Sequence, residues 1–329
     1  MSEANTSHIV SVSGGKDSTA VYLLAIEWSQ RNGFPFRAVF ADTGNELPPT
    51  YDYIRELPTK AGGPEVEWVK ADFTKDFARK RAFIAKNWEA AGVPADRVAR
   101  AIELLQPTGN PFLDLCMWKG RFPSTRARFC TDHLKRDPIM TRVVMPLMDQ
   151  HRSVWSWQGV RREEGKTVGH PRRLLPRTEY VGGDYWITRP IIEWKVAQVF
   201  DQHRRHGVAP NPLYRQGMGR VGCVCIHAAK EELARIALLY PEQVDRLEEW
   251  ERLVGEVSKR GQTTFFSADK TPGDHQGRTD VPMPGIREVV EWSKTSRGGA
   301  GLRPADPRRR GGRHVLPLVL RPLRVRAAT

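Results

Sequence analysis

The feature that most constrains this chain is the segment Ser-Gly-Gly-Lys-Asp-Ser at residues 13–18, which joins an apolar run to an amphipathic one. Residues 8–13 have the pattern of a short buried strand, and residues 18–32 carry apolar side chains at helical spacing. Two adjacent glycines let a backbone bend closely around an anion, and the helix that follows offers free N–H groups and a favourable dipole. The segment therefore predicts a phosphate-binding turn, with an ordinary turn between strand and helix as the alternative.

Each residue of the segment has a chemical part in this prediction. The expected phosphate-binding residues are Ser13, Gly14, Gly15, Lys16, Asp17 and Ser18. Lys16 supplies a cation, the serines supply hydroxyl donors, and Asp17 stands where it could cap the helix or help to hold Mg²⁺. The spacing of glycine and lysine is shorter than in a Walker loop, so this is a different kind of phosphate loop.

Strands and helices alternate over the first 70 residues. Residues 36–41 and 66–69 read as strands, and residues 48–57 read as a helix with proline near its start. Such alternation predicts an α/β fold, Rossmann-like and doubly wound, with a mainly parallel sheet and helices on both faces. Ligands of these sheets bind beyond the carboxyl ends of the strands. Asp42, Thr43 and Gly44 follow one such end and become further candidates for nucleotide contact.

The remaining chain predicts further helices and strands around this unit. Residues 107–124 read as a loop, and the polar residues 163–184 read as a mobile loop over the site. Helices are expected at 73–105 with a break near 92–94, at 132–148 with an interruption at Pro138, and at 194–206, 231–240, 241–259 and 286–293; strands are expected at 154–160 and 185–191. We predict an α/β domain at 1–228, a helical extension at 229–295 and a basic, disordered tail at 296–329.

The net charge and the hydropathy limit the kinds of partner that the chain can bind. The net charge is +14, but residues 297–329 hold nine arginines and one acidic residue, which leaves +6 for the rest of the chain. This modest excess suits a small anionic ligand, while nucleic acid stays open as a partner. No stretch approaches the ~20 apolar residues that cross a bilayer, and no signal peptide is visible. We therefore expect a cytoplasmic protein with no membrane association.

Four cysteines form the second group of candidate residues: Cys116, Cys130, Cys223 and Cys225. Structural disulfides are not expected in a reducing compartment. Cys223 and Cys225 precede a predicted helix and lie near Arg220, a setting that lowers thiol pKa values. Four thiolates could hold Zn²⁺ or a [4Fe–4S] cluster. Redox-active thiols and inert buried cysteines are the alternatives.

Several sequence blocks, in this order, resemble a known family. They read Phe-Ala-Asp-Thr-Gly-x-Glu at 40–46, Arg-Phe-Cys-Thr-x-x-Leu-Lys at 128–135, Gly-Val-Arg-x-Glu at 159–163, Arg-Pro-Ile-x-x-Trp at 189–194, Asn-Pro-Leu-Tyr at 211–214 and Arg-Val-Gly-Cys-x-Cys at 220–225. Together with residues 13–18, they resemble the PP-loop ATP pyrophosphatases, which are adenine nucleotide alpha-hydrolase-like proteins. More narrowly, the chain resembles the phosphoadenosine phosphosulfate (PAPS) reductase family in its phage and mobile-element branch.

The resemblance implies an enzyme that binds an adenine nucleotide. Members normally cleave ATP with Mg²⁺ between the α and β phosphates to activate an acceptor, and some bind PAPS and reduce it instead. At matching positions, Asp42 and Thr43 would lie near the ribose or adenine. Arg161 and Lys135 would contact the far phosphates or the acceptor, and with Lys16 and Asp17 they complete the expected catalytic set.

Two departures from the reductases favour ATP cleavage. The chain lacks the Glu-Cys-Gly-Leu-His segment that carries the catalytic cysteine of PAPS reductases, and it keeps the full phosphate loop. We expect ATP cleavage that activates an acceptor for sulfur transfer, with a nucleic acid or a sulfur carrier as acceptor. The alternatives are a thiol-dependent PAPS reductase and a non-catalytic, nucleic-acid-associated phage accessory protein. A homodimer also stays open.

The tail suggests a separate hypothesis. Phage-type relatives end in Cys-x-Ser-x-Tyr-Gly-Leu-Cys-Glu, whereas residues 315–325 read Val-Leu-Pro-Leu-Val-Leu-Arg-Pro-Leu-Arg-Val. Codons exist for this stretch that, shifted by one base, encode Cys-Arg-Ser-Ser-Tyr-Gly-Leu-Cys-Glu and a stop. We therefore interpret the tail as a frameshift product rather than a nucleic-acid arm. The nucleotide sequence of the gene tests this hypothesis.

Overall fold

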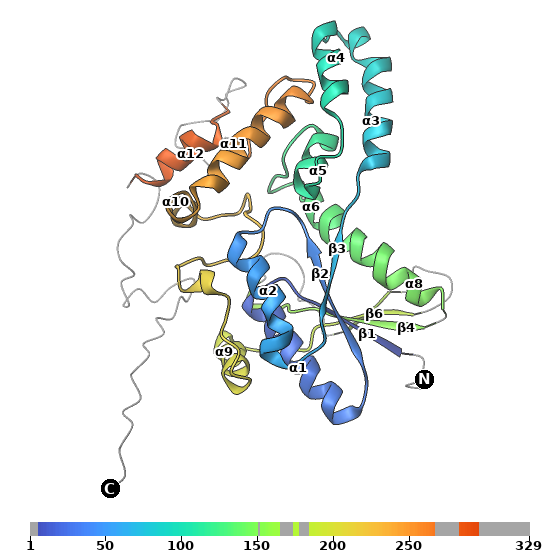
Figure 1. Ribbon diagram of the computed structural model, residues 1–329, viewed down its shortest axis with the longest axis vertical. Coiled ribbons are helices and arrows are strands. Elements are labelled where there is room, and N and C mark those ends of the chain that lie inside the picture. The colour runs from blue at the N-terminus through green and yellow to red at the C-terminus, as the bar shows by residue number, and fades with distance from the viewer. Residues whose placement is uncertain (1–5, 151, 165–173, 178–183, 267–282, 296–329) are drawn as a thin grey trace.

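The computed structural model describes residues 6–150, 152–164, 174–177, 184–266 and 283–295. It has two parts, an α/β part built on one sheet and a helical layer at one end of that sheet (Figure 1). The predicted disordered tail and its frameshift hypothesis lie outside the described residues. So does most of the polar segment that was expected to cover the site.

One sheet of six strands organises the α/β part, in the order β3-β2-β1-β4-β6-β5. The strands are β1 (Thr6–Ser11), β2 (Phe36–Asp42), β3 (Val66–Lys70), β4 (Ser153–Trp157), β5 (Leu174–Arg177) and β6 (Tyr185–Thr188). All neighbouring pairs are parallel except β5 with β6. The expected doubly wound, mainly parallel α/β fold is confirmed.

Side chains of the central strands are buried alternately on the two faces of the sheet. Val10 and Phe40 pack into the apolar cluster of one face, while Ile9 and Val39 pack into the cluster of the other. Because strand residues alternate in direction, two covered faces produce the nearly continuous apolar strands that the sequence displays.

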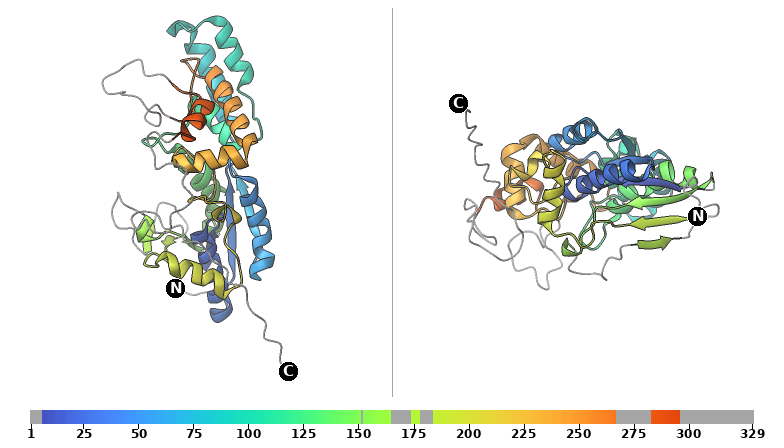
Figure 2. Two further views of the ribbon diagram at one scale, coloured as in Figure 1. Left: turned by 90° about the vertical axis from the view of Figure 1, so that its left-hand side faces the viewer. Right: turned by 90° about the horizontal axis from the view of Figure 1, so that it is seen from below.

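Helices cover both faces (Figure 2). On one face lie α1 (Lys16–Asn32), α2 (Pro48–Ala61) and α9 (Val196–Arg205). On the other lies a helical run made of α6 (Phe129–Thr131), η3 (Asp132–Arg136), α7 (Asp137–Ile139), η4 (Met140–Val144) and α8 (Met145–Met148). Pro138 falls in the short α-helical piece between two π-helical turns, so the expected interruption of the helix is confirmed.

The helical layer brings together segments from distant parts of the chain. It contains α3 (Thr74–Asn87), η2 (Glu89–Ala91), α4 (Ala95–Leu104), α5 (Pro111–Lys119), α10 (Lys230–Leu239), α11 (Pro241–Glu256) and α12 (Ile286–Ser293). Phe77, Phe112, Trp250 and Val289 belong to its single apolar cluster. Helices from both sides of residue 228 thus share one core, and the division into domains at that residue stays a prediction. Among the described helices, none has the length and hydrophobicity to span a bilayer.

Two sequence predictions were wrong. Residues 107–124 contain α5 rather than loop alone, because Asn110 caps the helix by accepting a hydrogen bond from Leu113 N and Pro111 suits its first turn. The segment 163–184 contains β5, which adds an antiparallel edge to the sheet. It is therefore not a loop throughout.

Candidate functional site

The phosphate loop runs from the end of β1 to the start of α1, as the sequence predicts. Gly14 has φ of 72°, a left-handed conformation, and a Cβ there would stand 2.8 Å from Thr50 Cγ2. Gly15 has φ of −83°, and its nearest neighbours would be 3.6 Å from a Cβ. The turn therefore requires glycine at position 14, because of its positive φ and its close approach to Thr50. At position 15 a Cβ would fit, and glycine there leaves the loop backbone uncovered by a side chain.

The two serines close the loop on itself. Ser13 N donates to Ser18 Oγ at 3.1 Å, and Ser18 Oγ donates to the carbonyl of Gly15 at 3.0 Å. The hydroxyl oxygens of Ser13 and Ser18 are 3.0 Å apart. These contacts fix a compact turn at the N-terminus of α1, the kind of place where backbone N–H groups bind anions.

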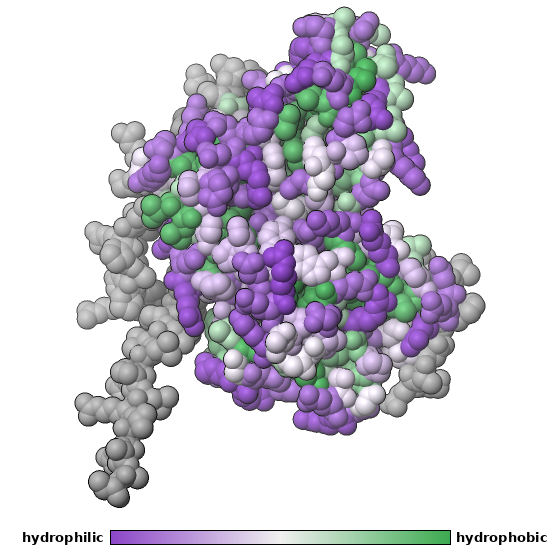
Figure 3. All heavy atoms as spheres, in the orientation of Figure 1, coloured by the Kyte–Doolittle hydropathy of each residue, from purple (hydrophilic) through white to green (hydrophobic). Residues whose placement is uncertain are grey.

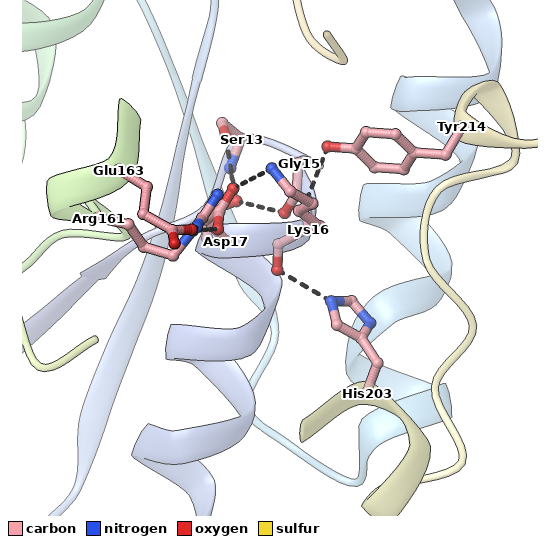
Figure 4. Close-up of polar contacts among 9 residues, drawn as sticks. Ser13, Gly15, Lys16, Asp17, Arg161, Glu163, His203 and Tyr214 are labelled. Atoms are coloured by element: carbon pink, nitrogen blue, oxygen red, sulfur yellow. Dashed lines mark hydrogen bonds and ion pairs between the residues drawn. The ribbon is translucent and has the colours of Figure 1, made fainter. Parts of the chain in front are cut away.

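A chain of charges crosses the start of α1 (Figure 4). Lys16 Nζ lies 2.6 Å from Asp17 Oδ2, Arg161 Nε donates to Asp17 Oδ1 at 2.5 Å, and Arg161 reaches Glu163 Oε2 at 2.7 Å. Asp17 and Arg161 are both buried. The N-cap is Gly15, without a side-chain cap, so the capping role considered for Asp17 was wrong.

The expected Mg²⁺ role of Asp17 does not fit this arrangement. Both of its carboxylate oxygens already face cations, one from Lys16 and one from Arg161. A carboxylate so occupied is a poor further ligand for a hard cation, which prefers free oxygen donors. The predicted contact of Arg161 with phosphate or acceptor also stays a prediction, since its contacts given above are to carboxylates.

Residues from the second half of the chain support the loop, and sequence reasoning assigned them no role. Lys16 N donates to the hydroxyl of Tyr214 at 3.1 Å, and Asn211 Nδ2 donates to Gly14 O at 3.2 Å, both from the region of η6 (Pro212–Tyr214). His203 Nε2 on α9 lies 2.9 Å from Lys16 O, and burial lowers its pKa. The Asn-Pro-Leu-Tyr block was the available signal.

Gly159 begins the Gly-Val-Arg-x-Glu block, but the sequence did not predict it as a site residue. A Cβ there would stand 2.7 Å from Ser18 N and 2.8 Å from the carbonyl carbon and oxygen of Asp17. These are backbone atoms of the first turn of α1, which cannot move like a flexible side chain. The loop after β4 therefore packs against the phosphate loop only because residue 159 is glycine.

Asp42, Thr43 and Gly44 form a buried turn at the end of β2. Asp42 Oδ1 accepts hydrogen bonds from Gly44 N at 2.9 Å and Tyr51 Oη at 3.0 Å, and Asp42 Oδ2 lies 3.0 Å from Lys70 Nζ. Thr43 Oγ1 donates to Glu46 Oε1 at 2.7 Å. These side chains hold the turn together, and their expected contact with ribose or adenine stays a prediction.

Lys135 lies in a different cluster from Arg161. Its Nζ is 3.9 Å from Cys223 Sγ, and residue 223 pairs through its backbone with Glu46. The Cys223 thiol raises the pKa of Lys135, with Glu46 acting in the same direction. Burial raises the pKa of Glu46, against the hydrogen bond from Thr43. The expected catalytic residues thus separate into a loop group and a cysteine group.

The four cysteines form one chain of neighbours. Burial raises the pKa of Cys116, with Cys130 adding to it, and burial raises the pKa of Cys130, with Cys225 adding to it. Burial also raises the pKa of Cys223 to about 11, although Lys135 opposes this. The expectation of a lowered pKa was wrong for Cys223, because the cost of burying a thiolate exceeds the help of a nearby cation.

A metal ion or cluster at these cysteines would need several of their side chains grouped around one point. Within the part of the chain that the structure describes, no group of three or more His, Cys, Asp or Glu side chains is placed to hold a metal ion. All four thiols are free. The assignment to Zn²⁺ or a cluster stays a prediction, and we derive no step through either.

The fold and this loop define an α/β protein with a compact glycine turn, between β1 and the N-terminus of α1, at the carboxyl edge of a parallel sheet. Residues 7–229 match the model of the phosphoadenosine phosphosulfate reductase domain, so the chain belongs to that family. The expected family is confirmed.

Relatives from phages support this assignment. A 37.8 kDa protein of Escherichia phage 186, described as uncharacterised, is 46% identical over 312 residues, which cover 90% of each chain. The nin region protein ORF290 of Escherichia phage lambda is 30% identical over 174 residues, which cover 52% of this chain and 51% of the relative. The expected phage branch is confirmed.

Solved structures give a more distant likeness. The PAPS reductase of Candida auris in its phosphate complex has a TM-score of 0.37 at 18% identity, covering 67% of this chain and 81% of that one. The FMN adenylyltransferase of Candida glabrata with FMN and AMPCPP also has a TM-score of 0.37, at 15% identity, covering 68% and 57%.

Proposed function

We propose that the chain binds MgATP at residues 13–18 and cleaves it between the α and β phosphates, transferring the adenylyl group to an acceptor in sulfur chemistry. The observation that carries the proposal is the loop geometry. A compact turn, braced by Ser18 and by Tyr214, presents the N-terminus of α1 beside Lys16. Membership of the family supports an adenine nucleotide as the ligand.

The proposed reaction needs little covalent chemistry from the protein. An oxygen of the acceptor attacks the α phosphorus, the bond from that phosphorus to the bridging oxygen breaks, and pyrophosphate leaves with the electron pair. Lys16 and the N–H groups at the start of α1 would stabilise the charge that develops on pyrophosphate. Arg161 would act as a positioning residue, because it holds Asp17 and Asp17 holds Lys16.

Magnesium enters the proposal with its substrate. Because Asp17 is occupied by two cations, the ion is expected to travel on the phosphates rather than in a site prepared by that carboxylate. It would neutralise phosphate charge and so lower the cost of bringing a polyanion to a buried edge of the sheet.

Two measurements test the proposal. Calorimetry with MgATP should give saturable binding to the full chain. ATP labelled at the α or the γ phosphate should then yield α label in AMP, with water as acceptor, and γ label in pyrophosphate. Lys16→Ala should lower this turnover by about 10²–10³-fold, as the loss of one preorganised charge contact does in other sites. Lys60→Ala is the matched control, since Lys60 lies exposed on α2 and pairs with Glu56 at 2.5 Å.

The other functions give different results. Release of sulfite from PAPS with thioredoxin would assign the reductase activity instead. Nucleic-acid binding with steep salt dependence, unchanged in Lys16→Ala, would assign the non-catalytic function. Failure of the chain to bind either ATP or PAPS in the presence of magnesium would remove the proposal altogether.

A further inference from the structure

A cavity of about 360 Å³ opens between the first turns of α2 and α11, outside the phosphate loop. It shares one loop with the predicted nucleotide contacts, because Glu46 lines the cavity while Asp42 and Thr43 stand just before it in the chain. Tyr51, also in the wall, donates to Asp42 or Glu46, each 3.0 Å from its hydroxyl. The cavity therefore adjoins the candidate site through hydrogen bonds.

Arg246 is a partly buried cation in this wall; burial lowers its pKa, while the nearby Glu46 and Glu242 act in the opposite direction. Its Nε is buried and has no hydrogen-bond partner within the described residues, nor does any described carboxylate form an ion pair with it. The guanidinium lies 5.0 Å from the ring centre of Trp250 and donates to Gln243, which in turn donates to the buried Asn45 at 3.0 Å. Trp250 and Gln243 thus hold the guanidinium in place, while its buried Nε has no partner among the described residues.

Arg55 supplies a second guanidinium from the opposite wall. It lies over the rings of Tyr51 and Trp68, at 5.9 and 5.3 Å from their centres, and pairs with Asp52 at 3.0 Å. The two rings are themselves stacked, which fixes the surface under Arg55. Planar guanidinium groups bind carboxylate and phosphate oxygens through paired N–H donors.

We infer that this cavity binds a small oxyanion, a carboxylate or phosphate group, through Arg246 and Arg55, and that it serves as the pocket of the acceptor. The assignment to an acceptor rests on the proposed function, whereas the binding of an oxyanion does not. Among the described residues, the guanidinium of Arg246 donates to Gln243 and has no carboxylate within ion-pair distance, so an oxyanion can supply the charged partner. The volume accommodates a small molecule rather than a folded partner.

The rim of the cavity favours a small molecule over nucleic acid. Three carboxyl groups, those of Glu46, Asp52 and Glu242, line the cavity with the two arginines, and burial raises the pKa of Glu46. Negative side chains next to the bound group repel a chain of phosphates more strongly than a single oxyanion. Hydrophilic residues predominate over α2 and α11 on this face, which suits entry of a polar ligand from water (Figure 3).

Calorimetry on the full chain tests the inference with inorganic phosphate and malonate as probes. The phosphate loop is first saturated with MgAMPCPP, so that only the second site remains. Arg246→Gln should weaken binding of whichever probe binds by about 10–100-fold, the effect expected for a charge-assisted hydrogen bond. Arg55→Gln should weaken it by a smaller factor, and this exposed residue can change without disturbing the core. Arg252→Gln is the matched control on α11, since Arg252 pairs with Glu249 at the surface.

The outcomes separate the two proposals. Loss of probe binding in both cavity variants, with MgAMPCPP binding unchanged, supports the pocket. If the chain does not bind MgAMPCPP, the proposed function fails, and the probe titration without nucleotide still decides the pocket. Absence of binding by both probes, equal binding in Arg246→Gln and Arg252→Gln, or binding of a single-stranded oligonucleotide alone would overturn the inference.

Discussion

Tyr214 contacts the phosphate loop although it lies almost two hundred positions further along the chain. Its hydroxyl accepts the N–H of Lys16, and Lys16 Nζ lies 5.9 Å from the centre of its ring. One side chain thus orients both the backbone and the charge of Lys16. Single substitutions should be most informative at residues that contact the loop but lie outside residues 13–18.

Tyr214→Phe should weaken MgATP binding by about 3–10-fold, because a neutral hydrogen bond contributes roughly 0.5–1.5 kcal/mol. Calorimetry on the purified variant gives the affinity. Tyr240→Phe is the matched control, since it loses a hydroxyl hydrogen bond of 2.6 Å to Gln216 that does not touch the loop. Equal affinities in wild type and Tyr214→Phe would contradict the role assigned to this hydroxyl.

Two glycines near the loop should respond differently to alanine. Gly159→Ala forces a methyl group against the backbone of Asp17 and Ser18 and should reduce the free energy of unfolding by about 1–3 kcal/mol. Gly15→Ala meets only ordinary contacts and should change stability by much less. Urea unfolding without nucleotide measures both, and equal losses would mean that the close approach at Gly159 is not rigid.

At the scale of elements, the side chain of Glu251 on α11 binds two segments that follow this helix in the chain. Glu251 accepts hydrogen bonds from Phe265 N at 2.6 Å and from Ile286 N at 2.8 Å. Its two oxygens therefore anchor both α12 and the stretch after α11. Burial raises the pKa of Glu251 to about 7, although the two N–H groups act against this.

The raised pKa of Glu251 predicts the direction in which stability changes with pH. A carboxyl that binds its proton more tightly in the folded state stabilises the fold fully below its unfolded pKa, about 4.5, and this contribution is lost as pH rises through about 7. The free energy of unfolding of wild type relative to Glu251→Gln should therefore fall across that window, by about 3 kcal/mol at most. Urea titrations at several pH values measure the difference. Glu249→Gln, exposed on the same helix, should leave the decline in place.

At the scale of the whole molecule, helices from both sides of residue 228 depend on each other, because they share one apolar cluster. Phe112 of α5 stacks on Trp250 of α11 at 5.5 Å, and both belong to the cluster that joins α3 and α4 to α10 and α12. Removing α10, α11 and α12 would expose this apolar surface, and burial of such surface provides the main free energy of folding.

A fragment of residues 1–228 should therefore fail to unfold cooperatively or should aggregate. Circular dichroism during urea unfolding is the measurement, with residues 1–295 as the control that keeps every described helix. The control should unfold in one cooperative transition, as we expect of the full chain. A cooperative transition of the 1–228 fragment would instead support the division into domains that the sequence suggested.

Much of the fold was predictable because its signals are short-range. Strand and helix periods gave the parallel sheet, and the breaks near residues 92–94 and at Pro138 came from local backbone chemistry. The helix α5 was missed because its signal was brief and apolar all round, which periodicity does not separate from a buried loop. The cap at Asn110 and proline at residue 111 were the cues available.

The sequence by itself determined a phosphate-type turn between a buried strand and a helix, because glycine conformation and a helix N-terminus are local properties. Only the tertiary structure decided what surrounds that turn. It placed Tyr214 and His203 against Lys16, turned Asp17 toward Arg161, and buried Cys223 so that its pKa rises instead of falling. Those outcomes depend on which distant segments return to the same place, and burial there outweighs the local cues that a sequence displays.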